Sequence, residues 1–393
     1  MFPRKTKIIC FALEGINSFA ATLYLNYLFF FLRDNFGFGN RKNLWVSALH
    51  GFVYIFAAWQ GGRFGQRRGY FNALKCGYGG MMVLMIIGAV FAKVLAIQMI
   101  VVVGWTLSVC FIWPALEAII SGGEDDPSLP RMLGIYNVVW AATAALAYFC
   151  GGAIFDALGW RAMFWLPGGL FGVQLVTVLW LERTVRAEVP GSAKPVTAHM
   201  PEAAAWAQAI SPKTFLRMAW LGNPVGYIAI NTVLAVIPQL AQRLGLSVTL
   251  SGLFCSLWFF ARLGTFVVLW KWTAWHYRFG WLAAAFVALI TSFATLLLAP
   301  NLWVVVLAQM GFGAAVGLLY YSSLFYSMDV GEEAQGEHGG LHEAFIGAGI
   351  FAGTAVGAMA LQFFPQSADA GTWAVGGLLT CGLGGLFWLR GWK

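Results

Sequence analysis

Apolar stretches follow one another along the whole chain, separated by short segments that carry charged residues, glycine or proline. Twelve stretches are long enough to cross a bilayer, because a spanning helix needs roughly 20 mainly apolar residues. Six are expected in the first half, at residues 8–32, 44–61, 71–92, 95–121, 132–155 and 162–181. Six more are expected in the second half, at residues 215–240, 250–270, 280–298, 302–328, 341–364 and 373–389. The pattern predicts an all-α membrane protein.

Composition supports this interpretation and excludes several classes of protein. Hydrophobic residues make up 60% of the chain and charged residues only 10%, whereas soluble domains contain about 25% charged residues. A soluble globular domain, a disordered chain and a nucleic-acid-binding domain are therefore excluded. The 47 glycines are typical of helices that pack closely within a bilayer.

The longest polar stretch lies between the sixth and seventh predicted helices, at residues 182–213. It contains several prolines and charges of both signs, which is typical of a linker. We therefore expect an N-terminal six-helix bundle at residues 1–181, a cytoplasmic linker at residues 182–213 and a C-terminal six-helix bundle at residues 214–393.

The distribution of positive charge predicts the orientation. If both termini are cytoplasmic, 17 of the 24 lysines and arginines fall on the cytoplasmic side and six on the other, and Arg262 lies within a span. Cytoplasmic loops of membrane proteins carry such an excess of positive charge. The formal net charge of +8 is thus explained by topology, and no acidic or nucleic-acid partner is expected.

The two halves of the sequence resemble each other weakly. At an offset of about 206 residues, Asn137 falls on Glu343 and Gly151 falls on Gly357. Parallel repeats of this kind occur in transporters. The loop after the second predicted helix, residues 62–69, reads G-R-F-G-Q-R-R-G. With six spans, a linker and six more spans, the chain resembles the major facilitator superfamily, whose pattern in this loop is G-x-x-x-D-R-x-G.

The resemblance covers nearly the whole chain, and it implies two pseudo-symmetric six-helix bundles with a central cavity lined by helices one, four, seven and ten. Two departures from the family pattern matter. Gln66 stands where the family usually has an aspartate that latches one conformation. In addition, residues 142–147 replace the glycine-proline part of the family's antiporter signature, which disfavours drug/proton antiport.

Polar residues inside the predicted spans are the candidate functional residues, because ionisable side chains are expensive in lipid and usually face a cavity or a partner. We predict a substrate-binding set of Asn17, Tyr24, Asn137, Trp140, Asn223, Tyr227, Asn231, Trp258, Arg262, Gln309, Tyr320 and Tyr321. We predict a proton-coupling or gating set of Glu14, Glu117, Arg67, His342 and Glu343.

Structural roles remain open for several of these residues. Glu14 would snorkel towards water, and Glu117 would form an ion pair with Arg67 or Arg131. Asparagines would bridge helices, and Arg262 would require a carboxylate, an anionic substrate or an aromatic face, because a guanidinium stays charged.

Metal and cofactor sites are not expected. His338 and His342 have a spacing that suits a shared ion on a helix, but Gly339 and Gly340 argue against a helix there. We therefore favour a protonation or gating role for His342 and Glu343. The six cysteines lie in or beside apolar runs without the spacing of metal ligands, which predicts small buried side chains.

These observations favour a secondary active transporter that moves a small polar or amphipathic organic solute by alternating access, coupled to protons. The alternative is a proton-driven multidrug or hydrophobic-compound efflux antiporter. An enzyme is not expected, because paired-aspartate motifs and repeated histidine boxes are absent from the sequence. We expect a monomer in a bacterial inner (plasma) membrane, with the lipid bilayer, the solute and protons as its partners.

Overall fold

The computed structural model describes residues 4–122, 129–188, 210–330 and 335–391, and every regular element within these ranges is an α-helix. The first half contains α1 (Arg4–Phe36), α2 (Asn40–Arg68), α3 (Tyr70–Val90), α4 (Leu95–Val109), α5 (Trp113–Ser121), α6 (Leu129–Leu158) and α7 (Ala162–Glu188). The second half contains α8 (Pro212–Arg243), α9 (Val248–Cys255), α10 (Leu257–Lys271), α11 (Phe279–Leu297), α12 (Leu302–Val330), α13 (Gln335–Phe363) and α14 (Ala370–Arg390).

Two of the predicted spans are interrupted. The fourth is divided into α4 and α5 by residues 110–112, and Pro114 lies in the first turn of α5. Proline has no backbone N–H to continue the hydrogen-bond ladder, so a helix interrupted just before it is expected. The eighth is divided into α9 and α10 at Ser256.

Eleven helical segments within the described ranges, with α4–α5 and α9–α10 each counted once, are long and apolar enough to cross a membrane. The helix α2 has 29 residues and is more polar. Its polar side chains contact other helices: Asn43 Nδ2 donates to Ala235 O at 3.1 Å, and His50 Nδ1 lies 2.7 Å from Thr106 Oγ1. The twelfth span and the cytoplasmic location of both termini stay predictions.

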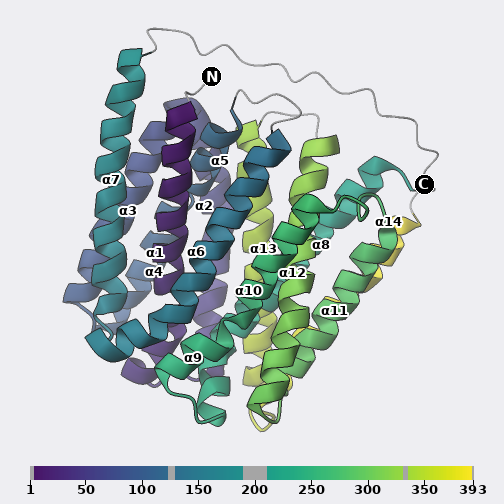
Figure 1. Cartoon of the computed structure of the whole chain (residues 1–393). Coiled ribbons are helices and arrows are strands. Elements are labelled where there is room, and N and C mark those ends of the chain that lie inside the picture. The colour runs from purple at the N-terminus through teal and green to yellow at the C-terminus, as the bar shows by residue number, and fades with distance from the viewer. Residues whose placement is uncertain (1–3, 123–128, 189–209, 331–334, 392–393) are drawn as a thin grey trace.

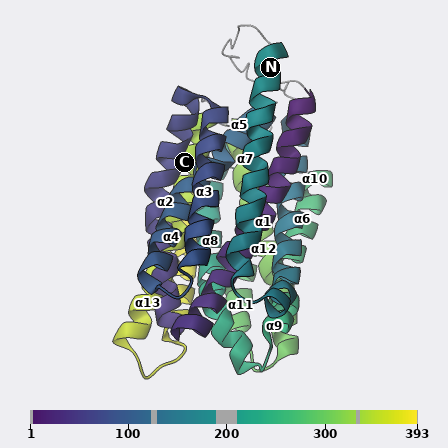
Figure 2. The same cartoon turned by 90° about the vertical axis from the view of Figure 1, so that its left-hand side faces the viewer.

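Figure 1 shows the helices of the first half on one side of the molecule and those of the second half on the other. Seen from the side in Figure 2, most helices run the full height of the bundle, and α9 lies at its lower edge. We call the end at which α1 begins the near end, and the end at which α1 finishes the far end.

Because α7 continues to Glu188 and residues 189–209 of the predicted linker lie outside the described residues, the division into two bundles stays a prediction.

Glycines allow α13 to approach α2 closely. A Cβ atom at Gly347 would lie 2.7 Å from the backbone nitrogen of Ile55, and one at Gly340 would lie 3.1 Å from the carbonyl oxygen of Ala58. The expectation that Gly339 and Gly340 prevent a helix is wrong, because α13 already begins at Gln335. The close contact with α2 that Gly340 permits outweighs the low helix propensity of glycine.

Substitution of Gly347 by alanine is expected to lower the thermal unfolding midpoint of the purified protein by several degrees. Alanine normally favours a helix over glycine by about 1 kcal/mol, but the new Cβ would lie only 2.7 Å from a backbone nitrogen of α2, so one of the two helices would have to shift. Gly376 on α14 is the matched control, because no atom lies within 4 Å of a Cβ built there. An equal or higher midpoint for Gly347→Ala than for Gly376→Ala would contradict the close packing of α2 and α13.

Candidate functional site

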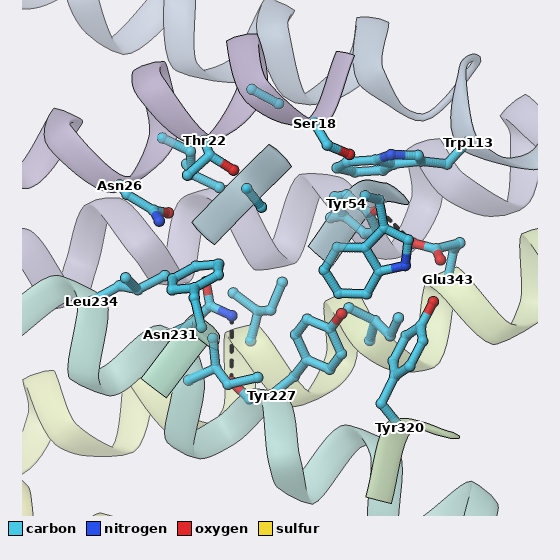
Figure 3. A pocket seen from close by; sticks show the side chains of 18 of the residues that line it. Ser18, Thr22, Asn26, Tyr54, Trp113, Tyr227, Asn231, Leu234, Tyr320 and Glu343 are labelled. Atoms are coloured by element: carbon cyan, nitrogen blue, oxygen red, sulfur yellow. Dashed lines mark hydrogen bonds between the residues drawn. The ribbon is translucent and has the colours of Figure 1, made fainter. Parts of the chain in front are cut away.

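A central cavity lies between the two halves, and both halves contribute to its wall. The space not filled by protein atoms is about 930 Å³, part of it open to solvent. Figure 3 shows Asn26 of α1 and Asn231 of α8 at one end of this cavity, and Trp113, Tyr54 and Glu343 at the other. The lining combines many aromatic rings with a few polar and charged groups, which is typical of sites for small organic molecules.

Four charged residues line the cavity: Glu14 of α1, Glu117 of α5, Arg262 of α10 and Glu343 of α13. Two come from each half of the chain. All four lie within the predicted spans, where a side chain that faced lipid would be strongly unfavourable. The cavity therefore accounts for the ionic groups that are most difficult to place in a membrane protein.

Glu14 is fully buried and is held by two donors of the first half. Its Oε1 accepts hydrogen bonds from Ser18 Oγ at 2.6 Å and from Trp113 Nε1 at 3.3 Å. Its second oxygen, Oε2, is buried without a hydrogen-bond partner. Glu14 therefore does not extend to water at the end of its helix, and the snorkelling alternative is wrong. It lines the cavity and has no exposed surface.

Arg262 is only 3% exposed and lies among aromatic rings. Its guanidinium carbon is 4.7 Å from the ring centre of Trp140 and 4.9 Å from that of Tyr320. The rings of Phe266 and Tyr227 follow at 5.4 and 5.9 Å. Such cation–π contacts stabilise a desolvated guanidinium by roughly 2 kcal/mol. The nitrogens Nε and Nη2 nevertheless have no hydrogen-bond partner.

A hydrogen bond crosses the interface between the halves at Glu343. Tyr54 of α2 donates from its hydroxyl to Oε2 of Glu343 on α13, and both side chains line the cavity. Figure 3 shows the pair beside Trp113 and Tyr320. Because each partner belongs to a different half, this bond must break or rearrange if α2 and α13 separate.

Nine of the predicted site residues line the cavity: Glu14, Glu117, Trp140, Tyr227, Asn231, Trp258, Arg262, Tyr320 and Glu343. Eight do not: Asn17, Tyr24, Arg67, Asn137, Asn223, Gln309, Tyr321 and His342. Several of the second group support neighbours instead. Asn137 Oδ1 accepts from Trp140 Nε1 at 2.9 Å, and Asn223 Nδ2 lies 3.3 Å from His342 Nε2. The individual roles stay predictions.

Among the gating candidates, Arg67 does not line the cavity. Arg67 is exposed, and no ion pair joins Glu117 to Arg67 or Arg131 in the part of the chain that the structure describes. The metal site considered for His338 and His342 lies outside the described residues, because the side chain of His338 does.

Sequence reasoning missed Tyr54, Asn26 and Tyr136 as lining residues. Tyr54 follows His50 by one helical turn, and Asn26 lies on the same face of α1 as Ser18 and Thr22, at four-residue steps. Tyr136 directly precedes Asn137. Tyr54 was overlooked because the family resemblance places other helices around the cavity, and the polar face of α2 was the available signal.

Gln309 has hydrogen bonds that point to a structural role at the break between α9 and α10. Its Nε2 donates to Phe254 O at 2.6 Å, and its Oε1 accepts from Trp258 N at 3.4 Å. Gln309→Met is therefore expected to lower the thermal unfolding midpoint, because removing a buried hydrogen-bonding partner costs about 1–3 kcal/mol. Solute affinity is expected to remain near that of the wild-type protein. A loss of affinity at unchanged stability would instead restore Gln309 to the binding set.

Comparison with known proteins gives a family and a fold. The family model described as Major Facilitator Superfamily matches residues 9–354. No curated protein matches the sequence significantly.

Two solved structures illustrate the shared fold. The nucleoside transporter NupG is 11% identical with a TM-score of 0.69, over 99% of this chain and 100% of that one. The human organic anion transporter MFSD10 (TETRAN) is 14% identical with a TM-score of 0.68, over the same shares. At these identities the likeness shows the fold alone. The match across most of its length shows that this chain belongs to the Major Facilitator Superfamily, a family of multi-pass membrane transporters rather than enzymes.

Proposed function

We propose that the protein is a secondary active transporter that moves a small polar or amphipathic organic solute, coupled to protons, by alternating access. The observation that carries the proposal is the central cavity, in which Glu14, Glu117, Glu343 and Arg262 face one space from both halves. Membership of the family supports the transport function, and the charged groups supply candidate sites for a coupling ion.

Coupling would follow from the cost of burying charge. An ionised carboxylate is strongly disfavoured in a site closed to water unless it is paired. Glu14 has one oxygen without a partner, and a proton bound to this carboxylate would neutralise it. Neutralisation would then permit the conformational step that an uncompensated charge impedes.

Contacts at the far end support alternating access. Arg33 of α1 donates from Nη1 to the carbonyl of Pro238 on α8. Asp156 of α6 accepts from the backbone nitrogen of Thr249 on α9 at 3.0 Å. These polar contacts hold the two halves together at the far end, and opening a path on that side would require both to break.

The rival function, proton-driven efflux of hydrophobic compounds, is favoured by the aromatic wall. Trp105, Trp113, Trp258 and Phe259 all line the cavity and would suit an apolar solute. The buried carboxylates serve either function, so the direction of solute movement relative to protons distinguishes the two.

We also propose that both termini face the cytoplasm and that the protein acts as a monomer in a bacterial plasma membrane. The excess of lysine and arginine on one predicted side supports the orientation. Cysteine labelling of the exposed ends of the helices in intact cells would test it.

Proteoliposomes with an imposed pH gradient test the transport proposal. Nucleosides and organic anions are the first solutes to add, because transporters of the same fold are described as carriers of these two kinds. We expect at least one solute to accumulate with the gradient and to change the internal pH in parallel. Movement of solute against the proton flow would support the efflux alternative. Solute movement that never responds to the gradient would overturn proton coupling.

A further inference from the structure

We infer that the solute bears an anionic group, which binds to Arg262, and that it moves together with protons in symport. The inference rests on the proposed transport function and adds to it the charge of the substrate and the direction of coupling. Its basis is the hydrogen-bonding state of a buried cation in the cavity wall.

The unpartnered atoms of Arg262 form a specific edge. Nε and Nη2 are both buried without a hydrogen-bond partner, and in a guanidinium these two nitrogens lie side by side. Their N–H groups form a parallel fork that matches the two oxygens of a carboxylate or another oxyanion. The rings of Trp140, Tyr227, Phe266 and Tyr320 surround the guanidinium. The hydroxyl of Tyr227 also interacts with Arg262, but Nε and Nη2 are left without an acceptor.

Internal carboxylates do not neutralise Arg262 in this conformation. Glu14 accepts hydrogen bonds from Ser18 and Trp113, and Glu343 accepts one from Tyr54. Among the described residues, no ion pair joins Arg262 to these carboxylates or to Glu117. The cavity therefore contains a desolvated cation with no carboxylate of the described residues within ion-pairing distance. The anionic group of a solute would supply that partner.

The wall beside Arg262 indicates what the rest of the solute is. Trp140, Tyr227 and Tyr320 line the cavity and pack around the guanidinium, and aliphatic residues such as Ile230 and Ile346 line it as well. A flat or apolar body would be favourable against these side chains. The geometry therefore points to an amphipathic organic anion rather than to a small inorganic ion.

Protonation of the cavity carboxylates and binding of an anion are expected to favour each other. Beside Arg262, the titratable groups that line it are Glu14, His50, Tyr54, Glu117, Tyr136, Tyr227, Tyr320 and Glu343. With the three carboxylates ionised, negative charges outnumber the single guanidinium and repel an anion. Protonation removes that repulsion, and by linkage a bound anion promotes protonation to the same extent. A cationic solute would compete with protons instead, which is the requirement for antiport.

Matched probes test the charge of the solute directly. We would use aryl and alkyl carboxylates such as 3-phenylpropionate, each with its neutral amide and its amine analogue, and measure binding to the purified full-length protein by calorimetry. We expect a carboxylate to bind roughly ten- to a hundredfold more tightly than its amide, because that is the range of a charge-assisted hydrogen-bond pair. Binding is expected to be tighter in acidic than in alkaline buffer.

Variants assign the preference to one residue. Arg262→Gln is expected to abolish the preference for the carboxylate, and Arg262→Lys to retain only part of it, because lysine keeps the charge and loses the fork. Lys271→Gln, which removes an exposed cation from the same helix, is the matched control and should bind as the wild-type protein does. If Arg262→Gln fails to fold, the carboxylate preference of the wild-type protein and its reduction in Arg262→Lys still test whether Arg262 binds the anion.

Three results would overturn the inference: equal or tighter binding of the amide or the amine, an undiminished carboxylate preference in Arg262→Gln, or no binding of any carboxylate. Transport of the same probes separates this inference from the function on which it rests. Proton-linked movement of the amine or the amide alone would refute the anion and leave the transporter in place. Arg262-dependent binding without movement of any solute would refute transport and leave the anion site in place.

Discussion

Replacement of Glu14 by glutamine is expected to reduce proton-driven solute uptake in proteoliposomes to the level of protein-free vesicles. The glutamine carbonyl can still accept hydrogen bonds from Ser18 and Trp113, as Oε1 of Glu14 does at 2.6 and 3.3 Å. The local packing is therefore retained, while the group that would bind and release a proton is lost. Exchange of labelled solute at equal pH on both sides is expected to persist, because exchange requires no net movement of protons.

Asp34→Asn is the matched control for this experiment. Asp34 also lies on α1, but its side chain is 29% exposed and pairs with Arg33 at 2.8 Å, outside the cavity. We expect this variant to retain gradient-driven uptake, and both variants to unfold near the wild-type midpoint. Undiminished gradient-driven uptake by Glu14→Gln would remove Glu14 from the coupling mechanism and leave Glu117 and Glu343 as the candidates.

The membrane fold was accessible from the sequence because its main signal is local. A run such as residues 302–328 is mainly apolar, and it corresponds closely to α12 at Leu302–Val330. The start of α13 was predicted less well, since Gly339 and Gly340 have low helix propensity. Gly340 packs closely against the neighbouring helix α2, and local helix propensity does not include such a tertiary contact.

The charged residues of the candidate site were the easiest to predict from the sequence. Glu14 and Arg262 are conspicuous because lipid disfavours them, and both line the cavity. Neutral polar residues are harder to assign from spacing alone. Asn137 and Gln309 instead contact the side chain of Trp140 and the backbone of Phe254. Helix rotation and tilt decide between these outcomes, and hydrophobic periodicity does not determine either to within one residue position.

A cross-link between α6 and α9 at the far end is expected to stop transport completely. Asp156 Oδ2 lies 3.0 Å from the backbone nitrogen of Thr249, so cysteines at positions 156 and 249 would lie close together. In a background without the native cysteines, a short thiol cross-linker should block uptake of the Asp156→Cys, Thr249→Cys variant if the halves must separate there. The same linker on Lys75→Cys, Glu182→Cys joins α3 to α7, where the native side chains pair at 2.7 Å. Both of those positions lie within the first half, so uptake should continue. Uptake that survives the first cross-link would show that the far end never opens, and alternating access at this interface would be abandoned.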